Sequence, residues 1–451
     1  MVPETGTCNG SFPIPKLMIG KEDVEDFFKE LEGFHAQFAD CFSRQEPRDN
    51  FFQYMVGQMS HLERKSIEPI ALHVEDAKVR AMQHFISDVV WDDTRILSRY
   101  HGIVAEDLGD TEGVLIFDES GFVKKGSDST GVSRQYCGSI GKVENCQVGV
   151  FVAYASRHGY CMLGGRLFIP EKWFGEGFAK RRIKNKFPAD ITFKTKPQLA
   201  LDLVDGVRGW GLQNRLVLAD SLYGDGYEFR QGLRSRQLDY VVQVSGELMA
   251  WTKDPHPPKP PMKRGGKIPR KRFYAKELPP ARSLCQIAKE LPSQSWKKIT
   301  WREGTKGPLS SRFARVIVWM ANGLIQGKTM EVPSEELLIE WPEGKKEPLK
   351  YWLSSLSPHR TSWRGLVRKA KGRFRIEQDY EEMKGELGLD HFEGRSWQGW
   401  HHHVTLVTLA YAFLMLERIG NKKNFWIDVA SCPPMDPEML AHVYRHMSNL
   451  W

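Results

Sequence analysis

The sequence predicts an α/β protein in which helices flank a mixed β-sheet. Three regions of the chain lead to this prediction. Residues 20–105 repeat apolar side chains every three or four positions, as amphipathic helices do. Between residues 113 and 245, short apolar runs alternate with helical patterns, as in a sheet with helices packed on it. Residues 246–360 return to strand-like runs, so we expect an α-helical N-terminal domain, an α/β core and a β-rich insertion that interrupts the core.

The N-terminal domain, residues 1–108, is predicted from helical periodicity. Further helical patterns cover residues 50–62, 76–89 and 91–100. A bundle of this kind can bind DNA, mediate dimerisation or do both, and the sequence does not separate these roles. The first helix has one apolar face, which comprises Val24, Phe27, Phe28, Leu31, Phe34, Phe38 and Phe42.

The order of the predicted elements identifies the core, which comprises residues 109–245 and 361–420. This order, β-β-β-α-β-α-β, is that of the ribonuclease H-like fold, in which the first and fourth strands are neighbours. Asp118 ends the first strand and Asp220 ends the fourth, so we expect their carboxylates to meet. The expected strands cover residues 113–118, 146–155, 160–168, 215–220 and 239–245, and the expected helices cover 197–210 and 223–236.

The two aspartates are candidate metal ligands. An apolar run from Val114 leads to Asp118 and breaks at Gly121, and a second run from Leu216 leads to Asp220. Carboxylates at the ends of two neighbouring buried strands suit a divalent cation such as Mg²⁺, because hard cations take oxygen ligands. For either acid alone, ordinary turn chemistry at a strand end is an equally good interpretation.

The insertion, residues 246–360, begins with a basic stretch. Residues 253–276 carry nine Lys/Arg and six prolines against one Asp, which predicts an extended basic arm rather than regular structure. We expect this arm to contact DNA phosphates, and the alternative is a solvated loop. Strands are expected at 312–320, 335–341 and 349–354. The candidate DNA-binding residues of the arm are Lys263, Arg264, Arg270, Lys271 and Arg272.

A charged helical stretch, residues 371–384, offers a third carboxylate. With Glu377 at 0°, Arg373 lies at about −40° and Lys384 at about −20°, so the three form one stripe. Taken alone, this pattern is better explained as a surface helix with i,i+4 ion pairs. Glu381, at about 40°, competes with Glu377, whereas Glu382, at about 140°, is expected to face water together with Asp379 and Glu386. We favour Glu377 because its position between Phe374 and Tyr380 predicts that it is buried.

These motifs together resemble the DDE-type transposases of bacterial insertion sequences, specifically the seven-hundred-and-one-type branch of the insertion-sequence-four group. Arg373, Glu377 and Lys384 match the spacing of the family's R-E-K signature, although Ala370 stands where the signature has tyrosine. The other matching stretches are Asp118-Glu-Ser-Gly-Phe-Val-Lys-Lys-Gly, Gln135-Tyr-Cys-Gly, Asn145-Cys-Gln-Val-Gly and Ala219-Asp-Ser-Leu-Tyr-Gly.

The resemblance implies a site and a reaction. Asp118, Asp220 and Glu377 would hold two Mg²⁺ ions, which Mn²⁺ can replace, while Arg373 and Lys384 grip phosphates. The implied activity is cleavage of insertion-sequence ends and their joining to target DNA by two-metal phosphoryl transfer. The implied partners are double-stranded DNA, as terminal inverted repeats and target, and a second copy in a homodimer. The alternatives are a nuclease of the same fold without strand transfer and a domesticated, non-catalytic DNA-binding protein.

Composition is consistent with this resemblance. The chain has 64 Lys+Arg against 56 Asp+Glu, a net charge of +8 whose clustering suggests a polyanionic partner. Its seven cysteines form no C-x-x-C pair, which argues against a disulfide framework and a structural zinc site. The longest apolar stretch, residues 404–416, is too short to span a bilayer, and residues 1–16 lack a signal-peptide pattern. We therefore expect a cytoplasmic protein without a membrane partner, ending in a tail at 421–451.

Three consecutive histidines, His401 to His403, resemble a metal motif only superficially. Successive helical residues point about 100° apart, so three in a row cannot chelate one ion together. We expect them to contact DNA or to pack in the interior.

Overall fold

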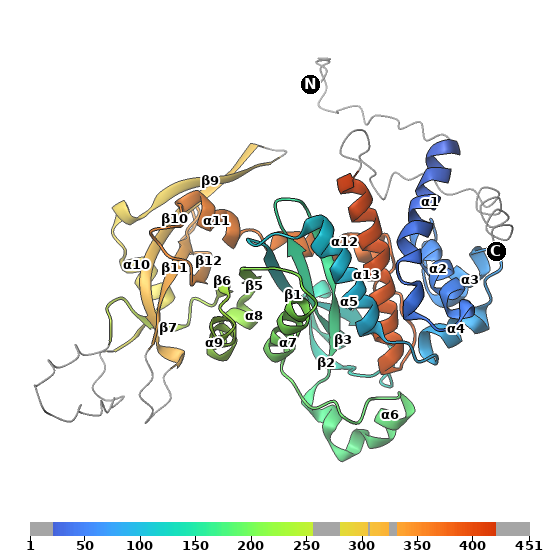
Figure 1. Ribbon diagram of the computed structural model, residues 1–451. Coiled ribbons are helices and arrows are strands. Elements are labelled where there is room, and N and C mark those ends of the chain that lie inside the picture. Colours follow the sequence, from blue (N-terminus) through green and yellow to red (C-terminus); the bar gives the residue numbers. More distant parts are fainter. Residues whose placement is uncertain (1–20, 256–279, 305–306, 324–331, 421–451) are drawn as a thin grey trace, which may run out of the picture.

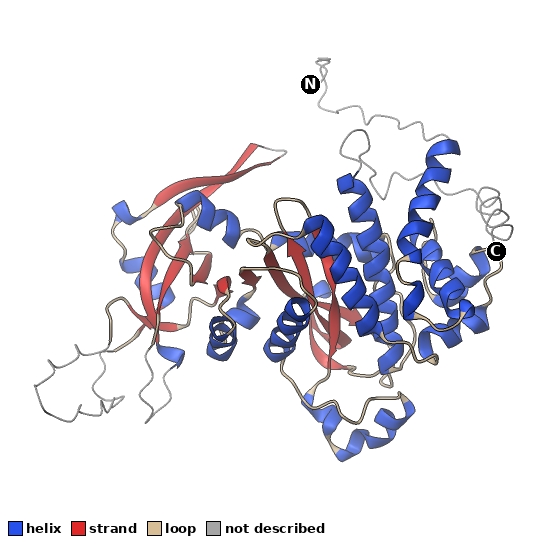
Figure 2. Ribbon diagram, viewed as in Figure 1, coloured by secondary structure: helices blue, strands red, loops and turns tan. Residues whose placement is uncertain are grey.

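The computed structural model describes residues 21–255, 280–304, 307–323 and 332–420. Strands and helices occupy distinct zones of the molecule, with helices gathered at one end and the strands of residues 246–360 at the other (Figures 1 and 2). A large mixed sheet with helices packed against it runs between these ends, which confirms the predicted α/β class. The expected basic arm lies almost entirely outside the described residues, including Lys263, Arg264, Arg270, Lys271 and Arg272.

Five helices precede the first strand and pack beside helix α13, Trp397–Gly420 (Figure 1). The predicted apolar face of the first helix is buried, and the rings of Phe27 and Phe34 lie 5.2 and 5.6 Å from the ring of Phe413 on α13. That face continues past the end of the helix through a short 3₁₀ turn. The five helices are α1 (Lys21–Ala36), α2 (Gln45–Met59), α3 (Ile67–His73), α4 (Val79–Ser87) and α5 (Asp93–Leu108).

The central strands follow the predicted order, with one addition. Strand β2, a five-residue strand that pairs with β3, was not expected because its sequence Ser-Arg-Gln-Tyr-Cys is mostly polar. The helix expected at 223–236 is two helices separated by Asp225 and Gly226. The elements are β1 (Val114–Val123), β2 (Ser133–Cys137), β3 (Lys142–Ala155), β4 (Tyr160–Phe168), α6 (Ala179–Lys184), α7 (Lys196–Gly209), β5 (Leu216–Ala219), α8 (Ser221–Gly224), α9 (Tyr227–Ser235) and β6 (Asp239–Val244).

Strand pairing places the two aspartates side by side. β1 and β5 are parallel neighbours, paired from Val114↔Leu216 to Ile116↔Leu218. Asp118 and Asp220 each lie two residues beyond the last of these pairs. β1 is longer than predicted and continues to Val123 against β3, so Asp118 lies within β1, but it lies past the end of β5. The expectation that the first and fourth predicted strands are neighbours is therefore correct.

The strands of residues 246–360 belong to the same sheet as the core strands. β12 pairs antiparallel with β6, and the strand order is β2-β3-β1-β5-β6-β12-β11-β10-β7-β8, with β4 on β3 and β9 on β10. The three strands predicted here are present, and β9, with the polar sequence Lys-Lys-Ile-Thr-Trp-Arg-Glu-Gly, is an addition. The elements are β7 (Met249–Trp251), β8 (Arg282–Ser283), α10 (Leu284–Glu290), β9 (Lys297–Gly304), β10 (Gly307–Met320), β11 (Ser334–Glu340) and β12 (Lys350–Ser354).

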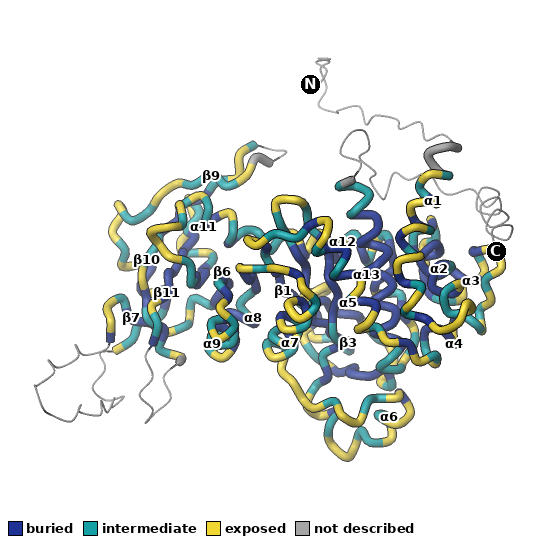
Figure 3. Tube along the Cα trace, viewed as in Figure 1, coloured by how far each residue is buried: buried dark blue, intermediate teal, exposed yellow. Residues whose placement is uncertain are grey.

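Helices α11 (Trp363–Ala370) and α12 (Phe374–Gly385) lead back to the core, and α13 follows them. α13 is buried along most of its length between the N-terminal helices and the sheet (Figure 3). This position explains why residues 404–416 are continuously apolar, since a helix buried on all sides has no polar face. Within the described ranges, no helix is both long and apolar enough to cross a membrane.

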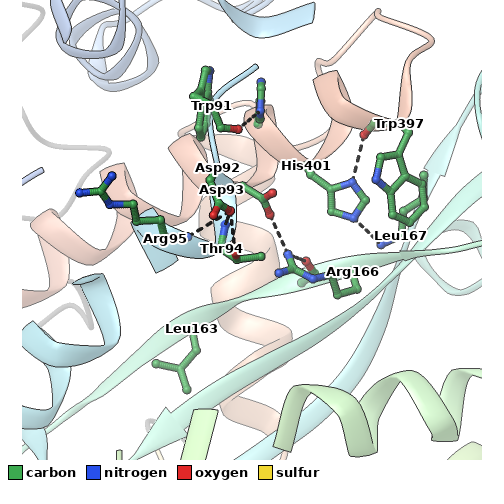
Figure 4. Close-up of polar contacts among 12 residues, drawn as sticks. Trp91, Asp92, Asp93, Thr94, Arg95, Leu163, Arg166, Leu167, Trp397 and His401 are labelled. Atoms are coloured by element: carbon green, nitrogen blue, oxygen red, sulfur yellow. Dashed lines mark hydrogen bonds and ion pairs between the residues drawn. The ribbon is translucent and has the colours of Figure 1, made fainter. Parts of the chain in front are cut away.

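The three histidines are buried packing residues of α13. His401 lies between the Trp397 carbonyl and the Leu167 amide, which caps the edge of β4 (Figure 4). His402 and His403 bond to backbone carbonyls, including those of Trp91 and Leu389. Burial lowers the pKa of each histidine to about 4, so all three are neutral at pH 7. Of the two roles expected for them, packing is the one observed.

Candidate active site

Three carboxylates meet at the end of strand β5. One oxygen each from Asp118, Glu119 and Asp220 lies within 4.8 Å of the others. Asp118 comes from β1, and Asp220 is the N-cap of α8, where its Oδ1 accepts a hydrogen bond from the Leu222 amide at 3.0 Å. The structure thus brings together the two aspartates that the sequence singled out. In the part of the chain that the structure describes, this is the group of His, Cys, Asp and Glu side chains that could hold a metal ion.

Glu119 is the member of this group that sequence reasoning missed. Side chains alternate along a strand, so Glu119 was expected to point away from Asp118. β5 pairs with β1 only as far as Ile116, however, and beyond that point this edge of β1 is open on the side of Asp220. Glu119 Oε1 forms an ion pair with Lys196 Nζ at 3.1 Å. The usable signal was the adjacent pair of acids, Asp118 and Glu119, directly after an apolar strand.

Like charges in a buried place set the electrostatics of the cluster. Burial raises the pKa of Asp118 to about 7, Arg373 lowers it, and the neighbouring Asp220 carboxylate raises it. Burial also raises the pKa of Asp220, and the charge of Glu119 adds to this effect. The donor set fits Mg²⁺ or Mn²⁺, because it consists only of carboxylate oxygens, which hard divalent cations prefer. A bound cation would relieve the repulsion that raises both pKa values.

Arg373 connects the cluster to Glu377. Its Nη1 lies 2.6 Å from Asp118 Oδ2, and its Nη2 lies 2.6 Å from Glu377 Oε1. Glu377 stands in the first turn of α12, is 53% exposed, and reaches the cluster only through this guanidinium. The expectation that Glu377 is buried is wrong, because Ile376 and Tyr380 occupy the face of α12 that turns to the core. The ion pair between Arg373 and Glu377 is the i,i+4 contact that their spacing predicted.

Lys384 contacts strand β1 at the other end of α12. Its Nζ donates to the Gly121 carbonyl at 3.1 Å and lies 5.4 Å from the centre of the Phe122 ring. Burial lowers the pKa of this lysine. The predicted stripe therefore exists, with Arg373 at the carboxylates and Lys384 against the strand that carries Asp118.

The expectation for the opposite face of α12 is wrong. Asp379 and Glu382 were expected to face water, but Asp379 is fully buried and both carboxylates lie within hydrogen-bond distance of the Tyr411 hydroxyl, at 2.9 and 3.0 Å. Burial raises the pKa of Asp379 to about 7. The cause is tertiary packing, because α13 covers this face of α12 and supplies Tyr411.

Comparison with known proteins agrees with this geometry. The family model described as DDE superfamily endonuclease matches residues 37–308, which include Asp118, Glu119 and Asp220 and end before Glu377. A relative from Microchaete diplosiphon, the "Probable transposase for insertion sequence element IS701", is 32% identical over 195 residues, which is 43% of this chain and 48% of the relative. The chain thus spans about half the length of this curated relative. Since the family model matches more than half of the sequence and contains both converging aspartates, the chain belongs to the DDE superfamily endonuclease family.

Proposed function

We propose that this protein is a DNA transposase that cleaves insertion-sequence ends and joins them to target DNA by two-metal phosphoryl transfer. The observation that carries the proposal is the convergence of Asp118 and Asp220, from neighbouring parallel strands, in an oxygen-only cluster. Membership in the DDE superfamily endonuclease family supports it, as does the similarity to a probable transposase. The catalytic unit would be ribonuclease H-like, formed by residues 109–245 and 361–420.

The remaining regions would serve this unit. Residues 1–108 would act as a domain for DNA binding or dimerisation, 246–360 as an insertion, and 421–451 as a tail. The arm residues Arg270, Lys271 and Arg272 lie outside the described residues, and we propose that they contact DNA phosphates without reading sequence. The substrates would be duplex DNA, as terminal inverted repeats and target, and the active complex would be a homodimer in the cytoplasm.

Asp118, Asp220 and Glu377 would hold the catalytic Mg²⁺ ions, for which Mn²⁺ can substitute. When bound, these cations lower the pKa of the attacking water or 3′-hydroxyl and stabilise the leaving oxygen. The work of the protein is to place these carboxylates and to position the DNA backbone. For Glu377 to join the aspartates, its carboxylate must exchange Arg373 for the cation, which its exposed position on α12 allows.

Arg373 and Lys384 would position the scissile phosphate. A guanidinium is a planar fork that binds carboxylate and phosphate oxygens alike, so Arg373 can pass from the carboxylates to a DNA phosphate. Its proximity to Asp118, at 2.6 Å, would put that phosphate beside the carboxylates. Lys384 would add a point charge if its ammonium turned from the Gly121 carbonyl toward the backbone.

A strand-transfer assay with Mg²⁺ tests the proposed function. The full chain is incubated with labelled DNA that carries the element's terminal repeats and with a target plasmid, and the products are separated by size. We expect joined product. Cut ends without joining would indicate a nuclease, and bound but intact DNA would indicate a non-catalytic DNA-binding protein.

The role of Glu377 is tested by single Glu→Gln variants at three positions of α12. We expect Glu377→Gln to lose Mg²⁺-dependent end cleavage. Glu381→Gln, which alters an exposed carboxylate, should be impaired at most, and Glu382→Gln should stay active because its carboxylate is turned to Tyr411. An inactive Glu381→Gln beside an active Glu377→Gln would assign the third carboxylate to the next turn of the helix.

A further inference from the structure

Glu119 has the surroundings of a metal ligand, although the proposed triad does not use it. We propose that Glu119 is a fourth carboxylate of the metal centre, and that Lys196 holds it in position. This inference rests on the proposed function, because it adds a residue to the same site. Its basis is the position of Glu119 among Asp118 and Asp220, with oxygens of the three residues within 4.8 Å of one another.

The two oxygens of Glu119 have different environments. Oε1 forms the ion pair with Lys196 Nζ, and both side chains are only 15% exposed. Oε2 is buried and has no hydrogen-bond partner among the described residues. Carboxylates that bind metals in proteins are commonly held by a hydrogen bond from a neighbouring group, which fixes their orientation. Glu119 shows this division between an oxygen that is held and an oxygen that is not engaged.

Lys196 is well placed to hold a carboxylate because its own position is fixed. It opens helix α7, where Thr195 and Gln198 form a reciprocal capping box. Its ammonium also lies 5.7 Å from the centre of the Phe168 ring on β4. The helix start and the aromatic ring restrict where the ammonium can go. Lys196 is therefore a positioning residue in this proposal, and Glu119 is the ligand.

A second buried polar group points to a ligand at this cluster. Tyr223, in the helix directly after Asp220, is fully buried, and its hydroxyl has no hydrogen-bond partner among the described residues. The carboxylates of Glu119, Asp118 and Asp220 are its charged neighbours. Leaving a buried hydroxyl unpaired costs about 1–3 kcal/mol, so such groups are found where a site is built to bind something.

A purely structural ion pair is the alternative explanation for Glu119. It accounts for Lys196, but not for three carboxylates brought within 4.8 Å of one another. Repulsion among these groups is a cost that a structural pair would avoid by facing away from the aspartates. The open edge of β1 beyond Ile116 gives Glu119 room to do so, yet its carboxylate lies beside Asp220.

The experiment is a Mn²⁺ titration of the DNA-free full chain, in which the electron paramagnetic resonance signal reports free Mn²⁺. We expect Glu119→Gln to weaken Mn²⁺ binding at least tenfold and Glu119→Asp, which keeps the charge but shortens the side chain, to weaken it less. The matched control is Glu112→Gln, which removes a carboxylate paired with Arg215 at 2.8 Å just before the same strand, and it should bind Mn²⁺ as the wild type does.

Asp118→Asn in the same titration separates the two proposals. If Asp118→Asn loses Mn²⁺ while Glu119→Gln binds it normally, the role of Glu119 is wrong and the metal centre stands. If Asp118→Asn also binds normally, the metal centre fails and Glu119 fails with it. Should Glu119→Gln not fold, Lys196→Met decides: affinity equal to or tighter than wild type supports a ligand freed from its competitor, and weaker affinity supports a structural pair.

Discussion

Asp93 and Asp118 are both buried aspartates paired with an arginine, but they differ in what else surrounds them. Asp93, at the start of α5, lies 3.0 Å from Arg166 on β4 (Figure 4), and Asp118 lies 2.6 Å from Arg373. Burial alone would raise the pKa of Asp93, but Arg166 outweighs it and the pKa is lowered. For Asp118, burial and two further carboxylates prevail over Arg373, and the pKa is raised to about 7.

The difference teaches how to distinguish a structural ion pair from a functional one in this fold. Around Asp93 the charges cancel, since its cationic partner is one arginine and the nearby histidines are neutral at pH 7. Around Asp118 an excess of negative charge remains after Arg373 is counted, because Glu119 and Asp220 share the place. A protein tolerates such an excess where a cation is to be bound.

The largest expected effect separates the two aspartates by activity. Asp118→Asn should reduce DNA cleavage to background, because the amide keeps the shape but not the charge that holds Mg²⁺. DNA binding and the stability of the metal-free protein should be unchanged or higher, since one of three repelling carboxylates is gone. The measurements are end cleavage, a DNA-binding titration and thermal unfolding in EDTA. Cleavage at near wild-type rate would refute the functional assignment of Asp118.

The pH dependence of stability should distinguish the two sites next. The folded-state pKa of Asp118, about 7, lies above its ordinary value, so the folded state binds more protons between about pH 4 and pH 7. Stability of the metal-free protein should therefore fall as pH rises through this window, by up to about 4 kcal/mol at about 1.4 kcal/mol per pKa unit. The lowered pKa of Asp93 acts only below its ordinary value, where stability is lost as pH falls.

Urea unfolding at pH 4.5 and pH 7 in EDTA measures this slope. It should be smaller in Asp118→Asn and unchanged in Asp93→Asn. Mg²⁺ added at pH 7 should restore stability to the wild type, because ligand binding stabilises the folded state. A wild-type protein whose stability does not change between the two pH values would show that Asp118 is not strained by its neighbours.

The smallest expected effect concerns the structural pair. Asp93→Asn should cost about 1–2 kcal/mol of folding stability, since it leaves Arg166 with only the Gly165 carbonyl as a hydrogen-bond partner in a half-buried place. End cleavage, assayed well below the melting temperature, should stay within a factor of about two of wild type, because the site is elsewhere. A large loss of cleavage without a loss of stability would show that Asp93 has a functional role of its own.

Local patterns were sufficient to predict much of the fold. The apolar face from Phe27 to Phe42, the strands at 160–168 and 239–244, and the neighbouring positions of Asp118 and Asp220 all follow from periodicity and element order. β2 and β9 were missed because their polar sequences are strand-like only when a neighbouring strand supplies hydrogen bonds. Tertiary context of that kind is not visible in a local window.

The candidate site shows the same division. The aspartates are marked by apolar runs before them, whereas Glu119 reaches the cluster only because β5 ends early. Asp379 and Glu382 are turned inward by Tyr411 of α13, a residue about thirty positions away. Burial of an acid depends on such distant partners, so helical angle alone placed these two residues on the wrong side.

The pairing of β12 with β6 has a consequence for how this protein can be taken apart. The chain leaves the sheet after β6, travels through residues 246–349, and returns directly alongside the strand that it left, from Tyr351↔Val244 to Ser354↔Val241. Excising this segment would expose a row of unpaired amides on a valine-rich strand, which is a template for aggregation. The segment is therefore not a detachable cassette, and a truncated catalytic unit would need a designed cap on β6 to remain monodisperse.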